Sequence, residues 1–291
     1  MPASRLRALV TNLSCALILG GASVLLHAQE IPAPGGAFRD CPTCPEMVVI
    51  PAGKFDMAWP PINQGRPYSE GEMRTITFAQ PYAIGKYEVT FDDWNACVKD
   101  KKCPALKDEG WGRGRRPVIN VTWMDADGYA IWLSRKTGKM YRLPSDGEWE
   151  YAARAGSNRS RFFGLQPEQV CEYANVHDIT AKKVHEFDWE HLPCEDKFAV
   201  TAPVGSFKSN AFGVHDMLGN VSEWVEDCLT NNWRGAPIDG SAWRTGNCSE
   251  RAYRGGSWIG HPPAYVSTAD WYKFVGTRHN DLGFRVARIL P

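Results

Sequence analysis

Hydrophobic positions in the first third of the chain follow the pattern of β-strands. Met47–Phe55 is an apolar, β-branched run that includes a Pro-Ala-Gly turn. Thr75–Phe78 and Tyr82–Val89 are two further runs of this type, with a break at Pro81 between them. Short apolar runs that are bounded by turn residues predict strands, so we expect strands in all three segments.

Two later segments have the spacing and the start signals of helices. Thr90 can cap a helix, and Asp93 three residues later completes an approximate capping box. A second helix is predicted after Thr122, and Gly138 is the expected C′ residue at its end. Apolar residues recur at helical spacing along its inner face, at Ala126, Tyr129, Ala130 and Leu133.

The clearest helix start lies in the segment LPSDGEWEYAARAG, which covers Leu143–Gly156. Ser145 is the predicted N-cap, Glu148 occupies position N3, and Gly156 is expected to end the helix. The residues predicted to face inward are Trp149, Ala152 and Ala153.

Regular patterns become rare between residues 157 and 252. This stretch is rich in Asn, Asp, Gly and Pro and contains only short strand candidates. A segment of this length in a compact domain needs another source of order, such as disulfides or metal ions. The whole chain has 12 Trp and 27 Gly, which favours a loop-rich fold packed on aromatic side chains.

The N-terminus has the features of an export signal. Arg5 and Arg7 precede the mostly apolar run Ala8–Leu26, and Ala28 offers a cleavage point, so residues 1–28 are predicted to be a signal peptide. The alternative is an uncleaved membrane anchor, which the polar residues within the run disfavour. We therefore expect a periplasmic or secreted protein without a membrane span after cleavage.

Charge excludes one class of partner. Lys plus Arg equal Asp plus Glu at 33 each, so the formal net charge is +0. A neutral balance provides no electrostatic footprint for nucleic acid. Nucleic acid is therefore not an expected partner.

Cysteine usage supports an oxidising compartment. Of the nine cysteines, Cys15 falls in the predicted signal and eight remain. An even number in an exported chain predicts disulfides, and neighbours in sequence are the easiest pairs to close. The expected pairs are Cys41–Cys44, Cys97–Cys103, Cys171–Cys194 and Cys228–Cys248. For the CPTC motif at Cys41–Cys44, a redox pair or half of a zinc site are the alternatives to a structural disulfide.

Seven ordered motifs resemble one known family. They are MVVIPAGKF, GKYEVT, PVINVTW, YRLPSDGEWEYAARAG, GVHDMLGNVSEWVED, YRGGSW and LGFR. This order is similar to that of the formylglycine-generating enzymes, also called sulfatase-modifying factors. The resemblance implies a single α+β, loop-rich domain over residues 47–291, distantly related to C-type lectins. Residues 29–46 before it are Pro- and Gly-rich, and this composition predicts a lead-in arm. In LGFR, Arg285 is available for a buried ion pair.

The resemblance also implies two structural calcium sites in the irregular half. Calcium takes six to eight oxygen ligands from carboxylates, amides and carbonyl groups. One implied site consists of Asn175, the Val176 carbonyl, Asp196 and the Phe198 carbonyl. The other consists of Asp216 in place of a family Asn, the Gly219 and Val221 carbonyls, and Glu223, in a segment expected to form a loop round the cation. Ordinary Asx turns are the alternative for these residues.

The copper chemistry of the family is not expected in this chain. Formylglycine-generating members bind copper(I) with two cysteines shortly after the motif serine, which here is Ser257. The corresponding residues are Gly260 and Tyr265, and neither can replace the soft thiolate ligand that copper(I) prefers. Whether iron or another transition metal is used stays open.

The segment after the Gly-Gly pair supplies the candidate site. His261 is a candidate general base, and Tyr265 a candidate proton donor or radical relay. The full candidate set is Ser257, Trp258, His261, Tyr265, Asp270 and His279. The alternative is that the aromatic residues pack in the core and that both histidines lie at the surface. With the resemblance, two functions follow. One is an oxidoreductase-like tailoring enzyme acting on a peptide-like or small-molecule substrate, and the other is a non-catalytic recognition or assembly module with a protein partner.

Overall fold

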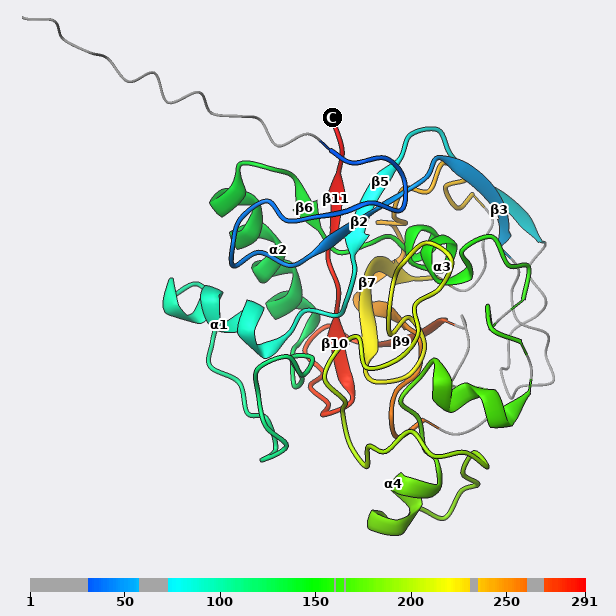
Figure 1. Cartoon of the computed structure of the whole chain (residues 1–291). Helices are drawn as coiled ribbons and strands as arrows, with labels where there is room; N and C mark the ends of the chain where they lie inside the picture. The colour runs from blue at the N-terminus through cyan, green and yellow to red at the C-terminus, as the bar shows by residue number, and fades with distance from the viewer. Residues whose placement is uncertain (1–30, 58–72, 160, 165, 231–234, 261–269) are drawn as a thin grey trace, which may run out of the picture. The chain divides into compact units, whose positions relative to one another are not determined.

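Short strands from opposite ends of the chain build a central sheet in the computed structural model, which describes residues 31–57, 73–159, 161–164, 166–230, 235–260 and 270–291 (Figure 1). Every neighbouring pair in the order β1-β2-β5-β11-β6 is antiparallel. The strands are β1 (Ala37–Phe38), β2 (Met47–Ile50), β5 (Tyr82–Gly85), β6 (Tyr141–Arg142) and β11 (Ala287–Ile289). Because β11 lies between β5 and β6, the sheet is complete only when the end of the chain is in place.

Side chains alternate across this sheet and enter two separate hydrophobic clusters. On β2, Met47 and Val49 join the cluster that contains the first two helices, whereas Val48 and Ile50 join the cluster that contains the third. This alternation is the period-two pattern of a strand that is buried on both faces. The predicted strand Met47–Phe55 is therefore wrong in one respect, because Pro51 and the following turn divide it between two sheets.

A second sheet carries the residues that matter most for the site. Its order is β10-β7-β8-β9, with β10 parallel to β7. Its strands are β7 (Ser222–Leu229), β8 (Asn247–Arg254), β9 (Asp270–Phe274) and β10 (Leu282–Phe284), and a separate hairpin pairs β3 (Gly53–Met57) with β4 (Arg74–Phe78).

The expectation of only short strands between residues 157 and 252 was wrong, because β7 and most of β8 fall there and each has 8 residues. The expectation of a loop at Glu223 was also wrong, because Glu223 lies on strand β7. The hydrophobic pattern failed because β7 buries carboxylates such as Glu223 and Asp227 beside its apolar residues.

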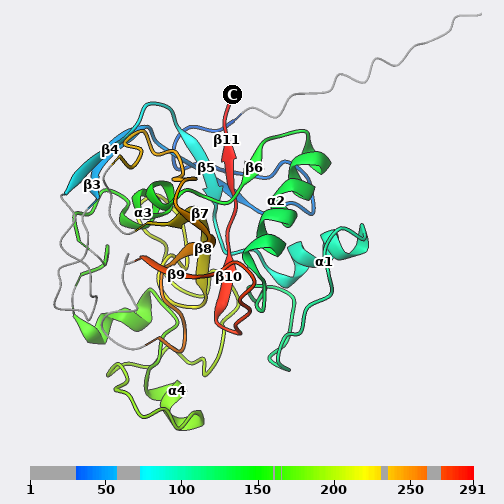
Figure 2. The same cartoon turned by 180° about the vertical axis from the view of Figure 1, so that it is seen from behind.

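Three capped helices flank the central sheet, with α1 and α2 on one side of β11 and α3 on the other (Figures 1 and 2). The predicted capping boxes at Thr90 and Ser145 are present, and Thr122, predicted only as a cap, forms a third with Asp125. The helices are α1 (Phe91–Lys99), α2 (Trp123–Thr137), α3 (Asp146–Arg154), the 3-10 helix η2 (Pro167–Glu172) and α4 (Ile179–Val184). Helix α3 ends one residue earlier than expected, because Ala155 already adopts a left-handed conformation.

The four predicted disulfides are confirmed: Cys41–Cys44, Cys97–Cys103, Cys171–Cys194 and Cys228–Cys248. Two of them fix the irregular half of the chain. The predicted signal peptide lies outside the described residues, and the expected arm contributes strand β1 to the sheet. Within the described part of the chain, no helix has the length and apolar character that a membrane span needs.

Candidate functional site

A Gly-Gly turn at the end of β8 positions the start of the candidate site. Gly255 has a φ of 91°, and a Cβ atom there would lie 2.9 Å from the Met217 carbonyl oxygen. Only glycine therefore fits this position without strain. After the turn, the Trp258 amide donates to the Asn220 carbonyl at 2.9 Å, and the Gly260 amide donates to the Ser257 carbonyl at 3.1 Å.

The turn is anchored from behind by a buried ion cluster on α3. Arg254 is the last residue of β8 and is only 1% exposed. Its guanidinium group binds Asp146, and at 3.0 Å it also binds Glu150. Glu150 in turn binds Arg154 one helical turn later. Since both acids lie on α3, this helix fixes the residue that immediately precedes Gly255.

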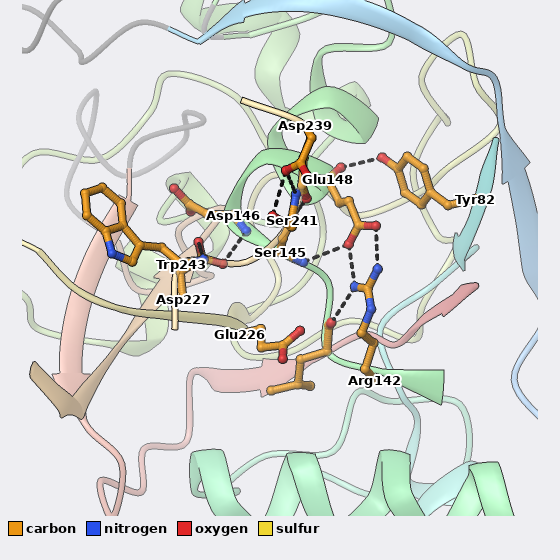
Figure 3. Close-up of polar contacts among 12 residues, drawn as sticks. Tyr82, Arg142, Ser145, Asp146, Glu148, Glu226, Asp227, Asp239, Ser241 and Trp243 are labelled. Carbon is orange, nitrogen blue, oxygen red and sulfur yellow. Dashed lines mark hydrogen bonds and ion pairs between the residues drawn. The ribbon is translucent and has the colours of Figure 1, made fainter. Parts of the chain in front are cut away.

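A polar network joins the start of α3 to β7 and to the loop before β8 (Figure 3). The two Asp227 carboxylate oxygens accept from the amides of Asp146 and Trp243, each at 2.7 Å. Burial, followed by the nearby charge of Asp146, raises the Asp227 pKa to about 8. At the other end of the network, Arg142 forms a bidentate pair with Glu148 at 2.5 and 2.7 Å. These contacts are structural, since they tie elements together behind the turn.

A short polar chain links the turn to the molecular surface. The Ser257 hydroxyl donates to Asp281 Oδ2 at 2.8 Å, and Asp281 Oδ1 lies 3.6 Å from His279 Nδ1. Burial alone would raise the Asp281 pKa, but the contacts with His279 and Ser257 outweigh it, so this pKa is lowered. Ser257 is 2% exposed and the His279 side chain is 51% exposed. The chain therefore runs from a buried hydroxyl through a carboxylate to an accessible imidazole.

The structure thus brings together two of the six predicted site residues, Ser257 and His279, and adds one that the sequence did not indicate. Asp281 was missed because its role depends on Ser257, 24 residues earlier. The backbone of Asp270 begins β9 and pairs with Arg254. His261 and Tyr265 lie outside the described residues.

Trp258 packs into an aromatic cluster rather than facing solvent. It is 2% exposed, and its ring lies 5.3 Å from Trp111, 5.2 Å from His185 and 6.3 Å from Phe187. Its indole Nε1 is buried and has no hydrogen-bond partner among the described residues. The cluster connects the turn to the segment that follows α4.

The first implied calcium site retains one open oxygen atom. Asn175 uses its amide nitrogen for bonds to Val200 and Asn220, while its Oδ1 is buried without a partner among the described residues. Asp196 accepts from the amides of Val176 and Phe198 at 2.8 and 2.7 Å, and burial raises its pKa to about 7. An unpartnered amide oxygen beside a carboxylate suits a hard cation, so these residues fit calcium.

The second implied site is arranged differently from the sequence expectation. Both Glu223 oxygens bind Arg285 at 2.6 Å, and one also accepts from Trp149 Nε1 at 2.7 Å. The buried ion pair expected for Arg285 is thus present. Asp216 accepts from the Gly205 amide at 2.7 Å, and its Oδ1 is buried without a partner in the described part of the chain. Asp216, rather than Glu223, therefore has an oxygen open to a cation.

Negative charge exceeds positive charge at this second position. Glu88 accepts from Asn220 and from the Val221 amide, and it is 1% exposed. Burial, followed by the charges of Asp216 and Glu223, raises the Glu88 pKa well above its ordinary value. The Asp216 pKa is also raised by burial, to about 6. Three buried carboxyl groups surround the guanidinium group of Arg285, and Arg115 adds a further positive charge near Asp216. The remaining excess of carboxyl groups favours protonation or an added cation.

Comparison with known proteins accounts for this architecture. The sulfatase-modifying factor enzyme 1-like domain matches residues 35–290. The chain belongs to this family. It is 32% identical over 271 residues to a formylglycine-generating enzyme of Thermomonospora curvata, covering 74% of this chain and 83% of that enzyme. It is 28% identical over 262 residues to the inactive C-alpha-formylglycine-generating enzyme 2 of Mus musculus, covering 74% and 75%.

A solved structure supports the same assignment. PvdO from Pseudomonas aeruginosa superposes with a TM-score of 0.76 at 39% identity, covering 89% of this chain and 100% of that protein. The predicted α+β, loop-rich fold of the sulfatase-modifying factor family is confirmed. All eight cysteines among the described residues form disulfides, so none of them has a free thiolate.

Proposed function

We propose that this member of the sulfatase-modifying factor family is an exported, oxidoreductase-like tailoring enzyme for a peptide-like substrate, and that it does not use the copper-dependent chemistry of formylglycine generation. The polar chain Ser257–Asp281–His279 carries the proposal. An accessible imidazole that is backed by a carboxylate can accept or donate a proton near neutral pH.

The three residues have distinct roles in this proposal. His279 is the group that contacts substrate, because its side chain is half exposed. Asp281 orients the imidazole ring, as a carboxylate does beside a catalytic histidine. Ser257 is buried, so it acts through its 2.8 Å bond to Asp281 as a positioning residue.

Calcium is proposed as a structural ion in the same domain. Asn175 and Asp196 would hold one ion, and Asp216 would supply the open oxygen for a second. Each ion would offset buried negative charge and would order the segment around it.

A recognition or assembly module is the second candidate. The aromatic cluster around Trp258 favours a binding function, because it continues into the segment after α4, which has exposed residues. The two functions differ in whether substrate mass changes. Extracts of a deletion strain, of the wild type and of His279→Ala can be compared by mass spectrometry.

The enzyme proposal predicts that a peptide-like precursor accumulates in the deletion strain and in His279→Ala. His191→Ala is the matched control, because His191 is also exposed and its ring packs against His177. The general acid–base role corresponds to a loss of about 10²-fold or more in conversion rate. Identical profiles in all strains, with protein at equal levels in the wild type and in His279→Ala, would leave the recognition module as the function.

A further inference from the structure

The Cys41–Cys44 disulfide differs from the other three in the length of chain that it closes. Its cysteines are 3 residues apart, whereas the others are separated by 6, 20 and 23 residues. In the chain-entropy description, a disulfide stabilises a fold more when it closes a longer loop. Cys41–Cys44 is therefore expected to stabilise the fold least of the four disulfides, so stabilisation alone explains its presence poorly.

The turn that holds this disulfide forms one wall of a cleft of about 460 Å³. This volume lies within the roughly 300–1,000 Å³ range of ligand sites. The cleft lies between the turn and the start of α1, and its lining includes Arg39, Pro42, Thr43, Pro45, Tyr87 and Arg115. Pro42 and Thr43 are the two residues between the cysteines, so a ligand that contacts them lies next to the disulfide.

The surroundings of the two sulfur atoms suit thiol exchange. Cys41 is partly exposed, while Cys44 is 1% exposed. Thr43 Oγ1 lies 3.7 Å from Cys41 Sγ, where its hydroxyl can stabilise a thiolate. The Arg39 guanidinium group donates to the Cys44 carbonyl at 2.7 Å. It also pairs with Glu46 at 3.0 Å. Lys99 and Arg115 are the other cations that line the cleft, together with the acidic residues Glu46, Glu88, Asp92 and Asp93. The exposure of Cys41 and its nearby hydroxyl donor are therefore what favour exchange, which depends on an accessible thiolate.

We propose that Cys41–Cys44 is an exchange-active disulfide that oxidises a dithiol peptide bound in this cleft. A substrate thiolate attacks Cys41 Sγ, which breaks the Cys41–Cys44 bond and forms a mixed disulfide. Cys44 leaves as a thiolate and takes up the proton released by the first substrate thiol. The second substrate thiolate then attacks the substrate sulfur of the mixed disulfide, and Cys41 leaves and is protonated. The substrate loses two electrons and two protons, and the protein gains them as two thiols.

Cys228–Cys248 is the matched control within the same molecule. Cys228 is 0% exposed and Cys248 is partly exposed, so the pair has a similar asymmetry of exposure. It differs in joining β7 to β8 across 20 residues. No neighbour of Cys228 or Cys248 in sequence lines the cleft, whereas Pro42, Thr43 and Pro45, which adjoin Cys41 and Cys44, do. A difference in reactivity between the two pairs therefore reports on the short turn and the cleft, and not on exposure.

The first test uses the wild-type protein with its disulfides intact. It is equilibrated in glutathione buffers of graded potential, its free thiols are alkylated, and each cysteine is quantified by peptide mass spectrometry. We expect the equilibrium constant for reduction of Cys41–Cys44 to exceed that of Cys228–Cys248 at least 100-fold. This corresponds to about 60 mV, since a tenfold change is about 30 mV. Reduction of both pairs at one potential, or of Cys41–Cys44 last, overturns the proposal.

The second test identifies the attacked sulfur. Cys44→Ser leaves Cys41 free, and Cys41→Ser leaves the buried Cys44 free. With oxidised glutathione as the probe, the mixed disulfide should form on Cys41 at least about tenfold faster than on Cys44, because exposure and thiolate character control the rate. Equal or slower reaction of Cys41 contradicts the assignment. If either variant does not fold, the wild-type titration decides the proposal alone.

Discussion

The buried pair between Arg285 and Glu223 offers a sharp test of how the centre of the domain is held together. Arg285 is 0% exposed. It binds both Glu223 oxygens at 2.6 Å and also donates to the carbonyl groups of Gly85, His215 and Asp216. Arg285→Met keeps an unbranched side chain but removes the charge and all of these donors. Glu223 then remains buried beside Glu88 and Asp216 without a guanidinium group.

The expected cost follows from this geometry. Removing one partner of a buried ion pair costs about 3–5 kcal/mol, because the other charge is left uncompensated. For a domain of this size each kcal/mol lowers the melting temperature by about 2–4 °C, so the total shift is about 6–20 °C. Arg244→Met is the control, because the Arg244 side chain is 68% exposed in its pair with Glu226. Its loss should stay below about 1 kcal/mol.

The loss should also depend on pH in a defined direction. Burial, followed by the charges of Asp216 and Glu223, raises the folded-state pKa of Glu88 above its unfolded value. A carboxyl group of this kind destabilises the fold as pH rises from the unfolded pKa through the folded one. Arg285 opposes this effect in the wild type, so the variant should lose more stability at pH 8 than at pH 5. Thermal unfolding followed by circular dichroism measures both values. Equal losses for the two variants, or a larger loss at pH 5, would refute the reasoning.

Three further predictions concern calcium, pH and copper. Chelation should lower the melting temperature by several degrees, since an ion at about 100-fold excess over its Kd adds about 2.7 kcal/mol to the stability of the fold. Asp196→Asn should reduce this response, and superimposable melting curves with calcium and with chelator would contradict the calcium assignment. Asp227 has its pKa raised to about 8 by burial and by Asp146, so urea unfolding should show wild-type stability falling between about pH 4 and pH 8. The fall should be smaller in Asp227→Asn, and an equal fall would exclude Asp227 as the cause. The purified protein, incubated with copper(I), oxygen and a sulfatase-motif peptide, should yield no aldehyde by mass spectrometry. Formylglycine in the product would contradict the interpretation that Gly260 and Tyr265 cannot replace the copper-binding cysteines.

Elements that depend on neighbouring residues were predictable from sequence, and those that depend on distant partners were not. The capping box of Ser145 and Glu148 spans three residues, so the start of α3 is visible in the sequence. Strand β7 was missed because Glu223 is made tolerable in the core by Arg285, 62 residues later, and by Trp149, 74 residues earlier. A polar residue in a buried strand cannot be distinguished from a loop residue without such partners.

The candidate site was predictable to a similar extent. Ser257 was selected as a candidate because it follows the Gly-Gly pair in the motif YRGGSW. His279 was selected because it lies shortly before the motif LGFR. Asp281 could not be assigned, since an Asp before an apolar strand resembles any turn residue until its contact with Ser257 is seen. The calcium ligands and the roles of His261 and Tyr265 stay predictions.

The central claim is that His279, oriented by Asp281, serves a tailoring reaction that needs no copper. The most direct measurement adds purified, copper-depleted protein to extract from the deletion strain and follows the precursor by mass spectrometry over time. The account predicts conversion by the wild type and at least about tenfold slower conversion by an equally folded Asp281→Asn, with a shifted pH profile, because loss of an orienting carboxylate impairs the histidine. Unchanged conversion by Asp281→Asn, or a strict requirement for added copper, would contradict it.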